Sequence, residues 1–361
     1  MARNQRGRRI RVATGFSAFG LALLLAACGS EAEPASAANG WAGEPKLETP
    51  VEQLDAALHC TPFEHPDKPP VLLVHGTFTT GAEQYEWTYI PLLSERGYDV
   101  CAVTYPDRGL GDMQVSAEYV VHALRRIHAE TGRQVAMIGH SQGAGMPRWA
   151  LKWWPSARAA VADFVLQAGP NHGTAISDPA SLLAGLGLPL PLPSTGGLPV
   201  PLPAAVRQFA PASLFTSAVN RGDETPGDID YTSLYTQFDE LVQPVSPVPT
   251  AALDWQQNNP KVSNLLLQDL CPGRFVDHVS IGLTDRLAFE LTLDAISQPG
   301  PANPQRAGGA ALCGLAAIIP DQIISTNAAS GLVNILRAEL SGGAPALHLV
   351  SEEPALKDYA R

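Results

Sequence analysis

Residues 134–143 read Gln-Val-Ala-Met-Ile-Gly-His-Ser-Gln-Gly, an apolar run that leads directly into a Gly-x-Ser-x-Gly pentapeptide. The run 134–139 is typical of a buried strand, and residues 141–153 are expected to form a helix that Pro155 closes. A sharp turn from strand to helix exposes the hydroxyl of Ser141, and small flanking residues permit that turn. The pentapeptide alone is a weak signal, because Gly and Ser also punctuate ordinary loops. Its context makes it a candidate nucleophile elbow.

Segments on both sides of this stretch alternate between strand-like and helical patterns. A helical pattern runs from Asp112 to Thr131 and is expected to end at Gly132. The further strand candidates are residues 71–75, 98–105, 161–168, 231–238 and 262–270. Strands that alternate with helices predict an α/β fold with a mainly parallel sheet covered by helices on both faces. Reactive groups then collect at the carboxyl ends of the strands.

The N-terminal 50 residues are expected to lie outside the fold. Five arginines precede an apolar run that ends in Leu25-Ala26-Ala27-Cys28, so residues 1–27 are interpreted as a signal peptide. The last four residues resemble a bacterial lipobox, in which Cys28 carries lipid; an ordinary cleavage site and a secreted protein are the alternative. Residues 28–50 are expected to form a flexible tether, rich in Ala, Glu, Pro, Ser and Gly. Residues 51–361 are expected to form a single domain.

Charge and cysteine content exclude several classes of protein. A net charge of −11 repels phosphate backbones, so nucleic acid is not an expected partner. No Cys-x-x-Cys pair or His-rich cluster has the spacing of a metal site, and neither a metal nor another cofactor is implied. If Cys28 carries lipid, four cysteines remain for two disulfides in an oxidising compartment, and three pairings are open. These four are Cys60, Cys101, Cys271 and Cys313.

A Leu/Pro-rich stretch at about 178–207 is a candidate insertion. It contains no charged residue between Asp178 and Arg207, and Leu alternates with Pro in two runs. So many prolines forbid a membrane helix. The stretch is either an apolar lid that contacts lipid chains or a rigid loop packed on the body.

A serine nucleophile needs a histidine base and a carboxylate that orients it. In this fold class the three residues occur along the chain in the order Ser, acid, His. His278 follows a strand candidate and a turn, whereas no strand leads into His348. Asp239 ends the strand-like run 231–238, and Glu240 is its nearest competitor. We therefore expect Ser141, Asp239 and His278 to act together.

An oxyanion formed on the substrate needs hydrogen-bond donors. The backbone N–H of Gln142, directly after the nucleophile, is the first candidate. The loop 75–81 after the first strand should supply the second, and Thr77 is the expected residue.

Four blocks between about Lys68 and Cys313 resemble the lipase B family named for Candida antarctica. They are residues 70–81, Ser141-Gln142-Gly143 with Trp149 and Pro155 downstream, residues 234–244 (Leu-Tyr-Thr-Gln-Phe-Asp-Glu-Leu-Val-Gln-Pro), and Cys271 with residues 275–278. The third block is far more specific than the pentapeptide.

The resemblance implies an α/β-hydrolase with Ser141 as nucleophile, Asp239 rather than Glu240 as acid, and His278 as base. It implies an oxyanion hole of Thr77 and Gln142. It also implies the disulfides Cys60–Cys101 and Cys271–Cys313, which leaves Cys28 for lipid.

The sequence departs from that family at several positions. His75 stands in place of a proline, and Gly139-His140 stand in place of Thr-Trp. Pro147 falls inside the elbow helix and is expected to kink it. The Leu/Pro-rich stretch is longer, so acyl-chain preference is not carried over.

The sequence thus predicts an exported serine hydrolase of carboxylic esters, acylglycerols or other lipid esters, through an acyl-enzyme on Ser141. The expected partners are a lipid or ester substrate and, through the lipid anchor, the cell membrane; a monomer is expected. The alternatives are a cutinase-like polyester hydrolase, a thioesterase, a short-chain esterase or a surface lipoprotein that binds hydrophobic ligands without catalysis.

Overall fold

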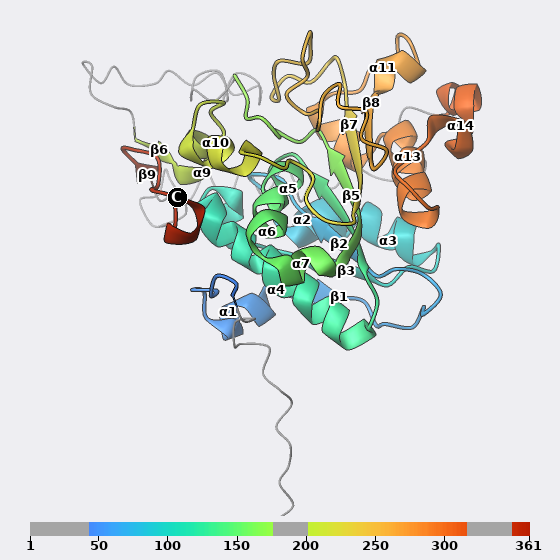
Figure 1. Cartoon of the computed structure of the whole chain (residues 1–361). Coiled ribbons are helices and arrows are strands. Elements are labelled where there is room, and N and C mark those ends of the chain that lie inside the picture. Colours follow the sequence, from blue (N-terminus) through green and yellow to red (C-terminus); the bar gives the residue numbers. More distant parts are fainter. Residues whose placement is uncertain (1–42, 176–200, 316–348) are drawn as a thin grey trace, which may run out of the picture. The chain divides into compact units, whose positions relative to one another are not determined.

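The described part of the chain is built around a seven-stranded sheet with the order β1-β3-β2-β4-β5-β7-β8 (Figure 1). The computed structural model describes residues 43–175, 201–315 and 349–361. The strands are β1 (Leu58–Cys60), β2 (Val71–Val74), β3 (Val100–Val103), β4 (Val135–His140), β5 (Val161–Gln167), β7 (Asp230–Tyr235) and β8 (Val262–Leu266). All neighbours pair in parallel except β1, which is antiparallel to β3. The predicted α/β fold class is confirmed.

The central strands are buried on both faces, which explains their unbroken apolar runs. In β2, Leu72 and Val74 belong to one hydrophobic core and Val71 and Leu73 to the other, because successive side chains of a strand point to opposite faces. The first core includes residues of α4 (Met113–Thr131) and α6 (Pro147–Trp153). The second includes residues of α3 (Tyr89–Ser94) and α13 (Arg286–Ser297). Helices therefore cover both faces of the sheet (Figure 1).

The predicted helix 112–131 has the caps that its sequence indicates. The Asp112 side chain accepts the backbone N–H of Gln114 at 2.9 Å. Gly132 follows the last turn with φ 68°, a left-handed conformation that glycine adopts without strain.

Several predicted boundaries differ from the structure, and the strands expected over 98–105 and 231–238 are the shorter β3 and β7. The elbow helix is divided into α5 (Gln142–Gly145) and α6, because Pro147, which lacks an N–H, begins a new segment. Pro155 does not only end a helix but begins α7 (Pro155–Ala159). The strand expected over 262–270 ends at Leu266, and α11 (Leu267–Leu270) follows it.

Short elements connect and flank these parts. They are α1 (Val51–Ala56), α2 (Gly81–Tyr85), η1 (Pro106–Gly109), β6 (Leu202–Pro203), α9 (Ala204–Gln208), α10 (Leu214–Asn220), α12 (His278–Leu283), α14 (Pro304–Ala307), η2 (Gly309–Gly314), β9 (Leu349–Val350) and η3 (Asp358–Ala360). No helix within residues 43–175, 201–315 and 349–361 is long and apolar enough to span a bilayer.

The last residues of the expected tether 28–50 contact the body of the protein. The Glu44 carboxylate accepts the backbone N–H of Ser156 and pairs with Arg125. The N–H groups of Glu48 and Thr49 donate to the Glu118 carboxylate at 2.9 and 2.7 Å. Packing on the body thus begins before residue 51, which corrects the expected boundary; the signal-peptide interpretation lies outside the described residues.

The expected lid-like insertion at 178–207 lies mostly outside the described residues. Its last part belongs to the body, since β6 pairs with β9 and α9 follows directly. Ala204, Ala205 and Val206 are buried, so this part packs as core.

Two disulfides join distant segments, Cys60 with Cys101 and Cys271 with Cys313. The paired cysteines lie 41 and 42 residues apart. Closing loops of this length removes conformational entropy from the unfolded chain, about 4 kcal/mol per disulfide in the loop-closure model.

A carboxyl pair between β5 and β7 predicts a pH-dependent stability. Asp163 is the register partner of Asp230. Burial and the Asp230 charge raise the pKa of Asp163 from 3.8 to about 7, against the opposing charge of Lys261. The folded protein therefore holds this proton more tightly than the unfolded chain does, and stability decreases as the pH rises through that interval.

We expect Asp163→Asn to remove this decrease in stability, because the amide has no acidic proton to lose as the pH rises. The difference between 3.8 and about 7 corresponds to at most about 4 kcal/mol, and solvent at this partly buried position reduces it. Urea unfolding at about pH 8 should show the variant more stable than the parent, with little difference at about pH 4. An equal effect at both pH values would contradict the assignment, and Asp228→Asn is the exposed control.

Candidate active site

Ser141 lies in a tight turn between β4 and α5. Its backbone has φ 57° and ψ −122°, which costs a non-glycine residue of order 1–3 kcal/mol. The turn brings backbone segments so close that the flanking positions accept only glycine. A Cβ on Gly139 would lie 1.8 Å from the Gly143 oxygen, and one on Gly143 would lie 2.1 Å from the Val74 oxygen. The Gly-x-Ser-x-Gly pattern is therefore a requirement of this turn.

The structure brings Ser141, Asp239 and His278 together in one hydrogen-bonded row. The Nε2 atom of His278 lies 2.9 Å from the Ser141 Oγ, and its Nδ1 atom lies 3.0 Å from each Asp239 carboxylate oxygen. Ser141 directly follows β4, Asp239 lies in the loop after β7, and His278 lies beyond β8 and α11. The carboxyl ends of these strands meet at one edge because the strands are parallel. The arrangement can transfer a proton from the serine hydroxyl to the imidazole.

The two neighbouring acidic residues have different partners. The Asp239 Oδ1 atom accepts the N–H groups of Leu241 and Val242 at 2.9 and 2.7 Å, which fixes the carboxylate beside the His278 Nδ1 atom. The Glu240 carboxylate accepts the backbone N–H of His278 at 3.0 Å, not its ring. Asp239 rather than Glu240 thus meets the imidazole.

Asp277, next to the histidine, has a separate task. Its side chain accepts the backbone N–H of Ser280 at 2.7 Å and caps α12, the helix that begins at His278. The cap fixes where the helix begins and so where the imidazole lies.

The environment of His278 favours its protonated form. Burial opposes a charge on this ring, which is 3 % exposed, but the charge and hydrogen bond of Asp239 outweigh it, with smaller contributions from Glu240 and Asp277. The pKa of His278 is therefore raised above 6.5. A base of this kind holds a proton taken from serine until a leaving group accepts it.

Thr77 and Gln142 lie together beside this row. Gln142 is the first residue of α5, so its backbone N–H has no acceptor within the helix. The Thr77 hydroxyl donates to the Gln142 Oε1 at 2.9 Å. The structure thus places both sequence-predicted donors at the N-terminus of the helix that follows Ser141, where a negative charge is favoured.

His140 and Gln84 also contact the site, although the sequence indicates no role for either. His140 lies 2.8 Å, through its Nε2 atom, from the carbonyl oxygen of His278. Gln84 lies between His140 and the loop that carries Thr77. Nothing in the sequence near residue 84 indicates this contact, since the two partners are 56 residues apart. Cys28 lies outside the described residues.

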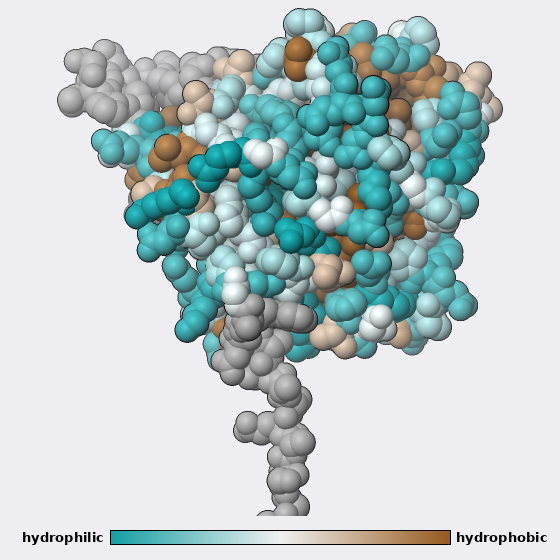
Figure 2. All heavy atoms as spheres, in the orientation of Figure 1, coloured by the Kyte–Doolittle hydropathy of each residue, from teal (hydrophilic) through white to brown (hydrophobic). Residues whose placement is uncertain are grey.

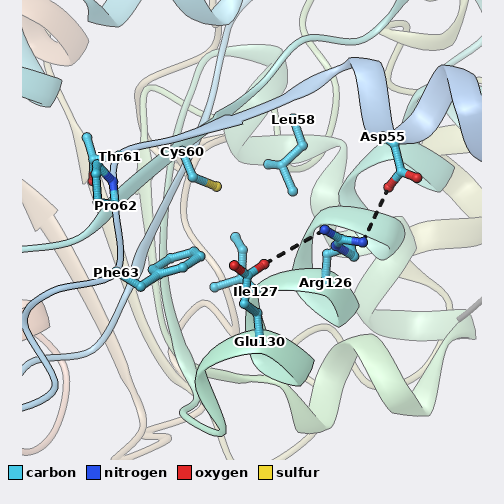
Figure 3. Close-up of a pocket in the computed structure, with 9 residues that line it drawn as sticks. All are labelled: Asp55, Leu58, Cys60, Thr61, Pro62, Phe63, Arg126, Ile127 and Glu130. Carbon is cyan, nitrogen blue, oxygen red and sulfur yellow. Dashed lines mark ion pairs between the residues drawn. The ribbon is translucent and has the colours of Figure 1, made fainter. Parts of the chain in front are cut away.

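A separate hollow of about 560 Å³, which none of these site residues lines, lies beside the edge strand β1 (Figure 3). Apolar side chains of Leu58, Phe63 and Ile127 line it, and Arg126 pairs with Asp55 and Glu130 there. In the sheet order, β3 and β2 separate β1 from β4, the strand that carries the nucleophile elbow. In the described part of the chain, no three His, Cys, Asp or Glu side chains gather as a metal site requires.

Comparison with known proteins assigns the chain to a family. Residues 71–313 match the model of the alpha/beta hydrolase family. Lipase B of Pseudozyma antarctica is 30 % identical over 259 residues, which cover 70 % of this chain and 69 % of that protein. The crystal structure of Aspergillus fumigatus lipase B superimposes with a TM-score of 0.76 at 28 % identity and covers 91 % of this chain and 76 % of that one. The chain belongs to the α/β-hydrolase family, as a lipase-like hydrolase similar to lipase B.

Proposed function

We propose that this protein hydrolyses carboxylic esters of lipids, such as acylglycerols, through an acyl-enzyme on Ser141. The observation that carries the proposal is the row from Asp239 through His278 to Ser141, with contacts of 3.0 and 2.9 Å. The row lies beside two candidate oxyanion donors, at the N-terminus of the helix that follows the serine.

The chemistry proceeds in two displacements. The Ser141 Oγ attacks the ester carbonyl carbon while its proton passes to the His278 Nε2. The Gln142 N–H and Thr77 stabilise the tetrahedral oxyanion, and the alcohol leaves with the proton from His278. Water then gives a proton to His278 and attacks the acyl-enzyme. The bond between the acyl carbon and the Ser141 Oγ breaks, His278 returns the proton to that oxygen, and the carboxylic acid is released.

Apolar side chains at the site favour esters with an apolar acyl part. Phe275 and Val279, which flank His278 on either side, are 65 % and 51 % exposed. The Phe275 ring lies 5.0 Å from that of Phe238, the residue before Asp239. The face in Figure 2 is mainly hydrophilic, with apolar patches along its upper part. Phe275, Val279 and the partly exposed Phe238 thus offer apolar surface next to the proposed acid and base, which an apolar acyl chain can contact. The two relatives reported above are both named lipases.

A series of p-nitrophenyl esters of increasing acyl length tests the proposal. We expect hydrolysis of all of them, with kcat/KM rising from acetate towards medium and long acyl chains, because added methylenes are buried against apolar side chains. Thioesters and a solid polyester run in parallel identify the thioesterase and cutinase-like alternatives. The absence of oxygen-ester hydrolysis would contradict the proposal.

Thr77→Val tests the oxyanion role. The change keeps the backbone N–H and the approximate volume but removes the hydroxyl, and we expect kcat to decrease by about 10²-fold or more with KM nearly unchanged. Thr77→Ser, which restores a hydroxyl, should recover most of the activity. Equal kcat values for the Val variant and the parent would show that the hydroxyl takes no part.

We also propose that the protein is exported and carries lipid on Cys28. The two disulfides support export, because such bonds persist in oxidising compartments. Mass spectrometry of the mature N-terminus checks this: a diacylated Cys28 is expected, and an unmodified N-terminus at another residue would contradict lipid anchoring.

A further inference from the structure

We propose that His140 and Gln84 are positioning residues that join the oxyanion loop to the catalytic histidine through one buried hydrogen-bonded bridge. This inference rests on the proposed function for its kinetic consequence. The bridge itself is a property of the fold and has a separate test.

The bridge has one consistent set of donors and acceptors. The carbonyl oxygen of His278 can only accept, so the His140 Nε2 atom, 2.8 Å away, carries the hydrogen. The Nδ1 atom of His140 is then an acceptor, and the Gln84 amide nitrogen donates to it at 3.3 Å. The Gln84 Oε1 atom remains free to accept, and it receives the N–H of Gly76 at 2.8 Å.

One end of the bridge lies in the loop that carries Thr77, and the other lies at His278, the first residue of α12. Gly76 directly precedes Thr77 in the loop after β2, whereas His278 lies beyond β8. His140 itself directly precedes Ser141. The bridge therefore connects the proposed base, the proposed nucleophile and an oxyanion donor through side chains that take no part in bond making.

The His140 ring is packed closely between two backbone segments. A Cβ on Gly282 would lie 2.1 Å from the His140 Cδ2, so the ring lies directly against α12. A Cβ on Gly76 would lie 3.3 Å from the His140 Nδ1. Gln84 and His140 are 2 % and 5 % exposed, so a lost hydrogen bond would leave its partner buried.

The bridge requires an uncharged His140 ring, and the surroundings of the ring keep it uncharged. Burial and the neighbouring His278 lower the pKa of His140 to about 3, against the backbone hydrogen bond to His278 and the charges of Asp239 and Asp277. The ring thus remains a fixed donor and acceptor where esterases are assayed. It does not compete with His278 as a base, although the two ring centroids lie 5.1 Å apart.

Kinetics of three variants test the positioning role. His140→Phe keeps a ring but removes both hydrogen bonds, and Gln84→Met breaks the bridge at its other side. We expect kcat for a soluble ester to decrease by about 10- to 100-fold in each, with KM within about twofold, because small displacements of reacting groups have effects of this size. The double variant should be no worse than His140→Phe, because both changes break one bridge.

Rescue and control variants separate positioning from a structural role. His140→Gln carries an N–H near the Nε2 position and should recover most of kcat. His122→Phe is the matched control: this buried histidine on α4 contacts Asp55 at 2.8 Å, and its loss should lower stability without lowering kcat. Unchanged kcat in both His140→Phe and Gln84→Met, or effects that multiply in the double variant, would overturn the proposal.

Nitrogen-15 NMR of the histidine rings gives a second test that needs no substrate. We expect His140 as the neutral Nε2–H tautomer, without titration from about pH 5 to about pH 8. An Nδ1–H tautomer, or titration in that interval, would overturn the bridge even if the protein hydrolyses esters. A correct tautomer in a protein without esterase activity would instead count against the proposed function alone.

Discussion

Ser141→Ala should lower kcat for p-nitrophenyl esters by about 10⁶-fold. The change removes the only atom of residue 141 that can form the acyl-enzyme, while the His278 ring remains held by Asp239 at 3.0 Å. The β-carbon and the strained backbone of the turn are retained, so the fold should be unaffected. Stopped assays with purified protein, together with circular dichroism and thermal unfolding, measure both quantities.

Ser94→Ala is the control for Ser141→Ala. This residue ends α3, on the face of the sheet whose core includes Tyr89 and Leu93, and its hydroxyl has no proposed role. Its loss should leave kcat unchanged. Residual activity of the Ser141 variant within about tenfold of the parent would remove the serine from the mechanism.

Asp239→Asn should lower kcat by about 10⁴-fold, the second largest effect that we expect. The amide keeps the volume of the carboxylate but loses the charge that stabilises the imidazolium, and it can hold the ring in the wrong tautomer. The same charge raises the pKa of His278 against burial. Without it the pKa falls, so the acidic limb of kcat/KM should move to lower pH.

Glu240→Gln is the matched control for that variant. It removes a charge one residue away, yet its amide oxygen can still accept the His278 N–H that Glu240 accepts at 3.0 Å. We expect less than about a tenfold decrease in kcat and a small downward shift of the acidic limb, since Glu240 contributes less than Asp239 to the pKa of His278. If Glu240→Gln lowered kcat more than Asp239→Asn does, the assignment of the acid would be reversed.

The fold could be predicted because its central strands follow a simple physical pattern. Residues 71–74 and 135–138 are buried on both faces and read as unbroken apolar runs. The Asp112 cap and Gly132 mark a helix by local chemistry alone. The short strand β1 gave no such pattern, because only three residues pair and two of them are exposed.

The candidate site could be predicted from residue order because the fold class restricts where reactive groups lie. The structure brings Ser141, Asp239 and His278 together, and their catalytic roles remain a proposal. The bridge through Gln84 and His140 could not be predicted, since it depends on side chains that meet only after folding. The contacts of Glu44 were missed for the same reason, because its segment has the composition of a tether.

Labelling with a fluorophosphonate probe tests the central claim most directly, because only an activated serine reacts with it. The parent protein should take up one probe, and mass spectrometry of its peptides should place the adduct on Ser141. His278→Ala should lose most of this reactivity, because the serine then lacks its base. A folded protein that remains unlabelled, or an adduct on another residue with Ser141 unmodified, would contradict the account.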